Sequence, residues 1–100
     1  MTKADLVEQV AEAIGPGITK KDCALVVDGF LNAVKRALAN GENIEIRGFG
    51  TLKVRKRKSR MARNPRTGQS VEVPSRSVPV FKPSQHLRTR VSQLDGQPVE

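Results

Sequence analysis

The residues of this sequence best suited to chemistry are the cations of one stretch, KVRKRKSRMARNPRTGQSVEV, which spans residues 53–73. Ammonium and guanidinium groups bind phosphates, and the counterions released on binding make the affinity fall steeply with salt. A folded core does not need this density of charge, so the stretch indicates binding to a polyanion. Against one acid, Glu72, it carries eight bases: Lys53, Arg55, Lys56, Arg57, Lys58, Arg60, Arg63 and Arg66.

The charge of the whole chain is distributed just as unevenly. The 100 residues have a net charge of +8, yet residues 1–46 hold five bases and seven acids, and residues 47–90 hold thirteen bases and one acid. A basic half of this kind favours nucleic acid as the partner over an anionic membrane. The alternative is a solvated face or a disordered tail, but the basic run lies between strand-like segments and is followed by a defined turn.

Composition and spacing also bear on the class of protein. One small domain of this length gains stability from a partner subunit. A single cysteine, Cys23, allows no internal disulfide, and no signal peptide or membrane span is visible, so we expect a cytoplasmic protein that begins near Met1. Cys23 and the lone His86 lie on different predicted helices, and Gly48-Phe49-Gly50 lacks the third glycine of a dinucleotide loop. We expect no enzyme, no cofactor, no metal site and no small-molecule substrate.

Two stretches of the N-terminal half show the period of an amphipathic helix. Thr2 and Asp5 form a capping-box pattern before the first stretch, which Gly15-Pro16-Gly17 ends because a helix does not continue through it. Thr19 predicts the N-cap of a longer helix that ends at Asn40-Gly41. We expect a helical hairpin whose helices each bury one apolar face: Leu6, Val7, Val10, Ala11 and Ile14 on the first, and Cys23, Val26, Val27, Phe30, Val34, Ala37 and Leu38 on the second.

From Asn43 the period changes to two, the period of a β-strand. Gly48-Phe49-Gly50 interrupts the strand, and we expect a bulge or a bend there. Strand character resumes over residues 51–58 and again over 69–73, with the turn formers of residues 64–68 between them. Because this stretch has few apolar residues, it predicts a long β-hairpin that projects from the body as an arm, over approximately residues 53–76.

Apolar character returns over residues 78–81, and Ser84 predicts the N-cap of a short last helix with Leu87 and Val91 on one face. Residues 92–100 are polar, and we expect a flexible tail there. The sequence thus predicts an α+β domain over residues 1–91. Its expected parts are an N-terminal helical hairpin, an antiparallel β-sheet with a projecting β-hairpin arm, and a short C-terminal helix.

The arm contains no aromatic side chain, whereas proteins that bind single strands commonly place aromatics among the cations for base stacking. Phe30, Phe49 and Phe81 lie on predicted body elements, where core packing is the ordinary role. We therefore expect duplex binding. Pro65 has two interpretations: a turn former, which the residues alone favour, or a rigid apolar wedge that enters between base pairs and kinks the duplex.

Three motifs in order, Gly48-Phe49-Gly50, Arg63-Asn64-Pro65 and Phe81-Lys82-Pro83, together with the helical hairpin, resemble the bacterial HU and integration host factor (IHF) family of DNA-bending proteins. The resemblance covers approximately residues 1–91. It implies an intertwined dimer whose helices form a compact body and whose two β-arms wrap the minor groove of double-stranded DNA.

The resemblance also implies roles for single residues. Pro65 matches the intercalating proline at the arm tip, which reverses the preference for a simple turn former, and Phe49 and Phe81 match positions of the core and dimer interface. Lys3 and Lys82 match body positions that meet flanking phosphates. The arm positions that face DNA in relatives correspond to Arg55, Arg57, Arg60, Arg63, Asn64 and Arg66. With the neighbouring cations, the expected DNA-binding set is Lys3, Arg47, Lys53, Arg55, Lys56, Arg57, Lys58, Arg60, Arg63, Asn64, Pro65, Arg66, Arg76 and Lys82.

Some positions depart from the family pattern. Ala62 stands where a glycine usually precedes the Arg-Asn-Pro motif, Leu52 replaces a common phenylalanine, and Gln85 replaces a common lysine. The turn over residues 15–18 is longer than in typical HU. These departures concern the DNA footprint rather than the fold.

The branch of the family is a separate question. Glu45 and Arg47 resemble the β subunit of IHF, where corresponding side chains help a sequence-preferring protein, although they could instead pair with one another. The dense basic arm and the absence of a visible partner subunit favour an HU-like homodimer. Our first expectation is therefore a nucleoid protein that binds duplex DNA with little sequence specificity and bends it by Pro65 intercalation. The alternative is an IHF-like subunit of a sequence-preferring heterodimer, and a third interpretation is a generic polyanion or RNA-binding protein.

Overall fold

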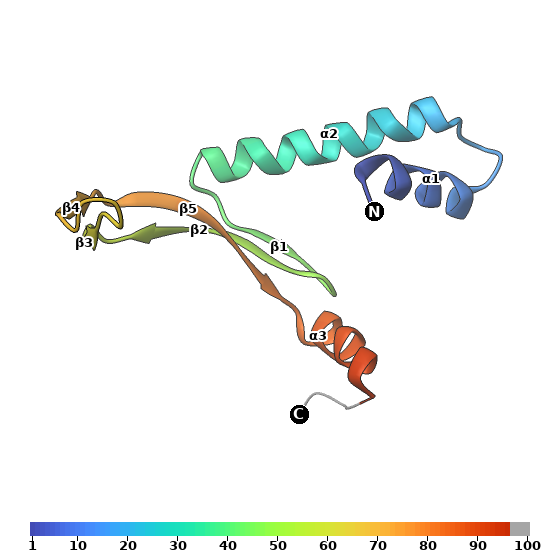
Figure 1. Ribbon diagram of the computed structural model, residues 1–100. Coiled ribbons are helices and arrows are strands. Elements are labelled where there is room, and N and C mark those ends of the chain that lie inside the picture. The colour runs from blue at the N-terminus through green and yellow to red at the C-terminus, as the bar shows by residue number, and fades with distance from the viewer. Residues whose placement is uncertain (97–100) are drawn as a thin grey trace. The chain divides into compact units, whose positions relative to one another are not determined.

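The structure is a computed structural model that describes residues 1–96 (Figure 1). The chain divides into two compact units, Met1–Arg36 and Ala37–Glu100. The predicted α+β class is confirmed. In order, the elements are α1 (Lys3–Ile14), α2 (Lys20–Ala39), β1 (Ile44–Ile46), β2 (Gly50–Arg57), β3 (Arg60–Arg63), β4 (Ser70–Val73), β5 (Arg76–Pro83), α3 (Gln85–Ser92) and a 3-10 turn, η1 (Gln93–Asp95).

The helix termini follow from local side chains and glycines. At the start of α1, Thr2 Oγ1 accepts a hydrogen bond from Asp5 N at 3.4 Å and Asp5 Oδ2 accepts one from Thr2 N at 2.8 Å, which completes the predicted capping box. Thr19 Oγ1 accepts from Asp22 N at 3.1 Å at the start of α2. The helical hairpin is therefore confirmed, and both of its helices begin at the predicted N-caps.

The end of α2 is a Schellman motif. Gly41 has a φ of 79°, which lets its N–H reach Leu38 O at 3.0 Å and lets Glu42 N reach Ala37 O at 2.9 Å. These two bonds satisfy carbonyls that the helix end would otherwise leave without a partner. The glycine therefore sets the direction in which the chain leaves α2.

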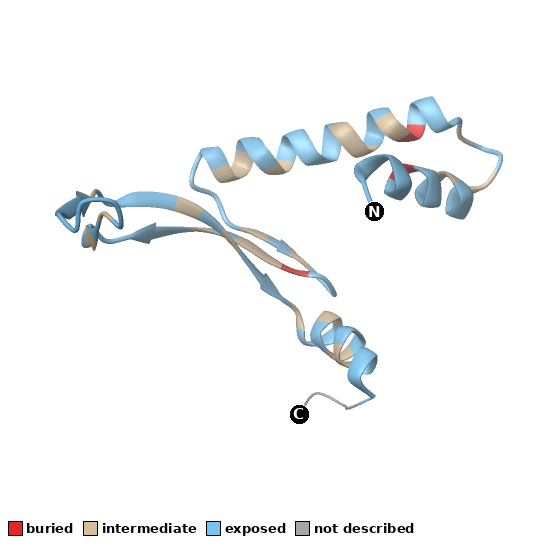
Figure 2. Cartoon of the chain, in the orientation of Figure 1, coloured by how far each residue is buried: buried red, intermediate tan, exposed pale blue. Residues whose placement is uncertain are grey.

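The apolar faces of the two helices are more open than the sequence predicts. Among the described hydrophobic side chains only Val7 and Cys23 are buried, and Cys23 Sγ donates to Val7 O at 3.7 Å (Figure 2). The prediction of one buried face per helix is wrong for the single chain: α1, with 12 residues, is too short to cover the stripe of the 20-residue α2, and most of the apolar face of α1 is exposed as well. The exposed apolar residues of the two faces include Leu6, Val10, Ile14, Val26 and Phe30.

A three-stranded antiparallel sheet in the order β1-β2-β5 forms the second unit's framework. Gly48-Phe49-Gly50 was expected to be a bulge or a bend, and it is instead the tight connection between two paired strands. Phe49 N donates to Ile46 O at 3.0 Å, and Gly48 has a φ of 78° that favours glycine. Gly48-Phe49-Gly50 therefore reverses the direction of the chain and does not bend a single strand.

Gly50 is needed for space. A Cβ atom there would lie 2.5 Å from Lys82 O and 2.7 Å from Phe81 Cε1. The Phe81 ring lies over this glycine and meets Phe49 with ring centroids 5.0 Å apart. Both rings remain partly exposed in the single chain.

The arm is built from two ladders in series (Figure 1). Strands β2 and β5 pair from Gly50↔Pro83 to Arg57↔Arg76, and β3 and β4 then form a separate two-stranded sheet from Arg60↔Val73 to Arg63↔Ser70. The predicted hairpin is thus confirmed as a paired arm, with an interruption between its ladders at residues 58–59 and 74–75. Pro74, which has no N–H to give to a ladder, lies at this interruption, whereas Pro79 lies within the paired part of β5.

Helix α3 begins as predicted, because Ser84 Oγ accepts from Leu87 N at 3.1 Å. Leu87 is half-buried, Val91 is exposed, and His86 is exposed as expected. The tail predicted over residues 92–100 starts within α3 and continues as η1. Residues 97–100 lie outside the described part of the chain, and the tail's flexibility stays a prediction.

Candidate nucleic-acid interface

Strand register gives the three-stranded sheet two chemically different faces. Residues directly opposite one another in an antiparallel pair point to the same side, and successive residues alternate. The register therefore sets a mostly apolar face against a face that carries most of the cations, although Val78 and Val80 also share this second face because they lie opposite Arg55 and Lys53. Ile44, Ile46, Leu52, Val54 and Phe81 share the first face, and Lys53, Arg55, Arg57, Arg76 and Lys82 share the second.

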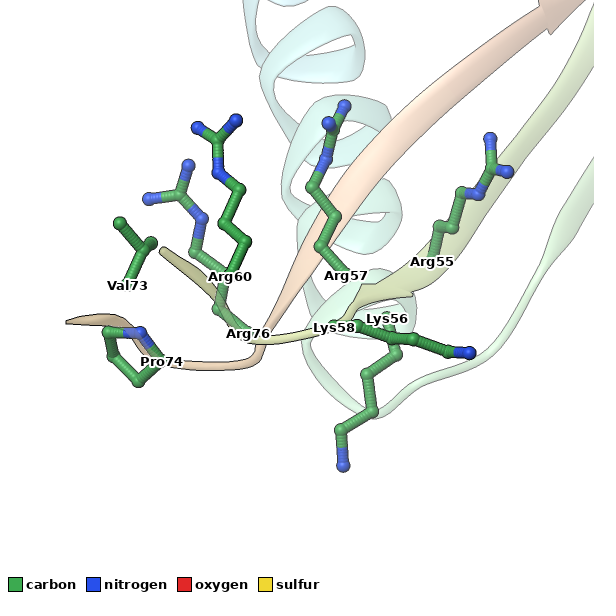
Figure 3. A pocket seen from close by; sticks show the side chains of 8 residues that line it. All are labelled: Arg55, Lys56, Arg57, Lys58, Arg60, Val73, Pro74 and Arg76. Carbon is green, nitrogen blue, oxygen red and sulfur yellow. The ribbon is translucent and has the colours of Figure 1, made fainter. Parts of the chain in front are cut away.

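The cations of the basic face gather most densely at the break between the two ladders. A shallow concavity of about 470 Å³ lies there, which we name the mid-arm basin. Its lining residues are Arg55, Lys56, Arg57, Lys58, Arg60, Val73, Pro74 and Arg76. Figure 3 shows the guanidinium groups of Arg55, Arg57, Arg60 and Arg76 pointing to one side of the arm, whereas Lys56 points to the other.

These charges have no neutralising side chain in the described structure. Arg57 and Arg76 are directly opposite one another, an arrangement of like charges that disfavours pairing of the strands. The ion pairs found within residues 1–96 both lie on the helices, where Lys3 Nζ meets Asp28 Oδ1 at 2.7 Å and Lys20 Nζ meets Glu8 Oε1 at 3.3 Å. An anion brought from outside would relieve the repulsion on the arm.

Backbone and side-chain hydrogen bonds fix the conformation of the arm tip. Asn64 N donates to Gln69 O at 2.8 Å, and Gly68 N donates to Asn64 O at 2.8 Å. Asn64 Oδ1 accepts from Arg66 N at 2.9 Å, an Asx turn around Pro65. Gly68 has a φ of 73°, which suits glycine, and Pro65 is exposed. The arm has little apolar packing, and at its tip these hydrogen bonds hold the conformation instead.

A second concavity of about 350 Å³ lies beside the connection between β1 and β2 on the same sheet. Glu45, Arg47, Lys53 and Lys82 all contribute to its lining. The ion pairs found within residues 1–96 include none between Glu45 and Arg47, so nothing in the described structure supports the interpretation in which they simply neutralise one another. Both side chains remain open to an external partner.

The predicted site residues therefore fall into separate places. Lys3 lies on α1, where it pairs with Asp28, while the other predicted positions belong to the second unit. On the arm and its base, the structure brings together Arg47, Lys53 and Lys82 in one concavity and Arg55, Lys56, Arg57, Lys58, Arg60 and Arg76 in the other, with Arg63, Asn64, Pro65 and Arg66 at the distal end.

Sequence reasoning missed two features of this surface. Val73 and Pro74 form part of the mid-arm basin, and Asn64, which was expected to face DNA, has its side-chain oxygen committed to the tip turn. Pro74 was a weak signal for the interruption, because proline has no N–H to give to a ladder, yet Pro79 lies within the β2–β5 ladder without interrupting it. Asn64 directly before a proline also carried a signal, since asparagine side chains commonly hold such turns.

Other kinds of site find no support in the described residues. Within residues 1–96 there is no group of three or more His, Cys, Asp or Glu side chains placed to hold a metal ion. No helix in that range combines the length and apolar content needed to cross a bilayer.

Comparison with known proteins gives a consistent result. A family model described as "Bacterial DNA-binding protein" matches residues 1–92. The chain is 46% identical over 100 residues to integration host factor subunit beta of Paraburkholderia phytofirmans, covering all of this chain and 92% of the relative. It is 44% identical over 99 residues to the same subunit of Herminiimonas arsenicoxydans, covering 99% of this chain and 97% of the relative.

Solved structures show the same likeness in three dimensions. The structure of Anabaena HU crystallised with DNA aligns with a TM-score of 0.84 at 35% identity, covering 92% of this chain and 98% of that one. HU from Thermotoga maritima aligns with a TM-score of 0.64 at 32% identity, covering 91% and 98%.

Proposed function

Because the chain belongs to the bacterial DNA-binding protein family of HU and integration host factor, we propose that it is one subunit of a dimer that bends duplex DNA at preferred sites. Members of this family are architectural proteins, and the protein is not an enzyme. The observation that carries the proposal is the row of cations along one face of the β2–β5 ladder, none of which forms an ion pair with a described acid. The site of action is the bacterial nucleoid.

This proposal, bending at preferred sites by an IHF-like subunit, replaces our first expectation of an HU-like homodimer, which rested on the dense basic arm. The relatives reported above are subunits of integration host factor at 44–46% identity over nearly the whole chain, against 32–35% for the HU structures. Glu45 and Arg47 support this choice, because they line a concavity beside Lys53 and Lys82 without pairing with each other. A carboxylate can accept a hydrogen bond from a base edge and so discriminate between DNA sequences, whereas contacts to phosphates position the duplex without reading it.

A partner subunit is part of the proposal. Monomeric proteins rarely leave large apolar side chains open over a continuous face. Here Phe30 is 56% exposed, Val26 is 65% exposed, and the Phe49 and Phe81 rings of the second unit are open as well. A second chain that covers these side chains would supply the core that one chain lacks. The relatives' name, subunit beta, supports a different chain as that partner.

In this proposal the arm binds the minor groove and Pro65 acts at its end. Phosphate contacts by the arm cations give affinity, and insertion of a rigid apolar ring unstacks one base step at a cost of a few kcal/mol. Pro65 is exposed and its turn is held by Asn64, as a wedge requires.

Fluorescence energy transfer between the ends of a labelled duplex tests site preference. A library of duplexes is first selected for binding to the protein alone and to the protein with its candidate partner subunit. Competition between the selected site and a random duplex then gives the preference, which specific binders raise to roughly 4–10 kcal/mol. Equal bending of every duplex by the protein alone would instead establish the HU-like homodimer.

The substitution Pro65→Ala tests the wedge. We expect the dependence of affinity on salt to stay the same, because no cation is removed, and the energy transfer at saturating protein to fall toward that of unbent DNA. Transfer equal to that of the unchanged protein would remove intercalation from the mechanism.

A further inference from the structure

We propose that the mid-arm basin also binds a compact chain of linked phosphates, inorganic or carried by a nucleoside, in the absence of DNA. The inference goes beyond the proposed function, because duplex binding needs the arm as a whole whereas this ligand would need one concavity of it. Bound there, the ligand would occupy cations that the duplex requires and would compete with DNA.

The first support is the charge of the lining. Of the eight residues that line the basin, six are cations, and the other two, Val73 and Pro74, are apolar. No carboxylate belongs to the lining. A site of this composition selects anions, and arginine forks suit phosphate oxygens in particular, since each can donate two parallel hydrogen bonds.

The second support is that four guanidinium groups point to the same side of the arm. Arg57 and Arg76 are directly opposite one another, Arg55 lies two residues along the same face, and all three point to the side where Arg60 also points (Figure 3). Along a strand, residues two apart are separated by about 6.6 Å. Several linked phosphates, spread along such a face, can contact these groups together.

The third support is the break in the arm itself. Residues 58–59 and 74–75 lie outside both ladders. Strand pairing is therefore interrupted at the point where the like charges are densest. A multivalent anion would remove the repulsion that register imposes on Arg57 and Arg76. Binding should therefore also order the junction between the ladders.

The apolar residues of the lining can distinguish an inorganic phosphate chain from one carried by a nucleoside. Val73 and Pro74 offer a surface on which a nucleobase or a sugar could rest, and inorganic phosphate chains have no group for it. Tripolyphosphate and adenosine triphosphate, both without magnesium, thus carry the same number of phosphates and differ in this contact. Tighter binding of adenosine triphosphate than of tripolyphosphate would identify a nucleoside ligand, and equal or weaker binding of adenosine triphosphate would identify the phosphate chain alone.

The test uses the full chain, labelled with nitrogen-15, at constant ionic strength. Titration with tripolyphosphate should give saturable shifts of backbone signals that concentrate at residues 55–60 and 73–76. The variant R57Q/R76Q should bind at least tenfold more weakly. Its matched control, K20Q/K21Q, loses two charges on α2 and should bind within twofold of the unchanged protein. Shifts that rise without saturation, or that spread evenly over all lysines and arginines, would show ionic screening only and overturn the proposal.

A second measurement keeps this inference separate from the proposed function. The protein is first bound to a labelled duplex, and tripolyphosphate is then compared with sodium chloride of equal ionic strength. We expect at least tenfold more displacement by tripolyphosphate. Equal displacement would overturn the competition, while failure to bind the duplex before any phosphate is added would count against the proposed function alone.

Discussion

The helical hairpin and the arm treat their charges in opposite ways. In the hairpin, the cations Lys3 and Lys20 are each paired with a carboxylate, and Thr2 and Asp5 satisfy the first backbone groups of α1. On the arm, none of the described cations forms an ion pair, and two of them, Arg57 and Arg76, are directly opposite one another. The hairpin pairs two of its cations internally, and the arm leaves its cations available to a partner.

Their apolar groups differ in the opposite sense. The hairpin leaves a continuous apolar stripe open, with Val26 and Phe30 more than half exposed, whereas the arm has little apolar surface to cover. Its order comes from strand pairing and from the hydrogen bonds around Asn64. The hairpin thus exposes apolar side chains that need an apolar partner, and the arm exposes cations that need an anionic partner.

The largest effect is expected from a charge placed in the apolar stripe, Val26→Asp. If a second subunit covers this face, the carboxylate is buried without a partner, at a cost of several kcal/mol. We expect the dissociation constant of the dimer to rise at least a hundredfold, measured by sedimentation equilibrium over a range of protein concentrations.

The adjacent Leu25→Asp is the matched control. Leu25 is 62% exposed, close to the 65% of Val26, yet helical periodicity places it on the side of α2 away from the stripe. It should leave the dimer unchanged. If both variants raised the dissociation constant of the dimer equally, the apolar stripe would have no special role in dimerisation. The proposed difference in apolar surface between the hairpin and the arm would then have no consequence for assembly.

A smaller effect is expected on the arm from the double variant R60Q/R63Q. Removal of two phosphate contacts should weaken binding to every duplex alike and reduce the slope of log affinity against log salt by roughly 1.8. Filter binding or anisotropy at several salt concentrations gives both quantities, with K20Q/K21Q as the control for lost charge. A loss confined to one DNA sequence would contradict phosphate contacts and favour base reading at these positions.

The contrast between the regions also explains how much the sequence could predict. Local rules gave the capping box at Thr2 and Asp5, the helix end at Gly41, the cap at Ser84 and the turn at the arm tip, because each depends on a few neighbouring residues. Periodicity and charge gave the arm and its cations. These parts of the fold and of the candidate site depend on short-range chemistry.

What the sequence could not give depends on distant pairing. The exposure of Val26 and Phe30 follows from how little of α2 the shorter α1 can cover, and periodicity cannot distinguish a face buried within one chain from a face covered by another. The concentration of cations in the mid-arm basin depends on the register that sets Arg57 opposite Arg76. The reversal at Gly48 likewise requires knowledge that β1 and β2 are partners.

The smallest effect is expected at the tip, where Asn64→Ala removes the acceptor for Arg66 N. One such bond contributes about 1 kcal/mol, so affinity should change by a few-fold at most, while the angle of DNA bending at saturating protein should fall because Pro65 is less firmly held. Asn64→Ser keeps an oxygen that can hold the turn, though more weakly. Energy transfer on the same duplex should then follow the order unchanged protein, serine variant, alanine variant. If Asn64 instead contacts DNA through its amide, serine should lose as much as alanine, and the tip would be ordered for recognition rather than for presenting the wedge.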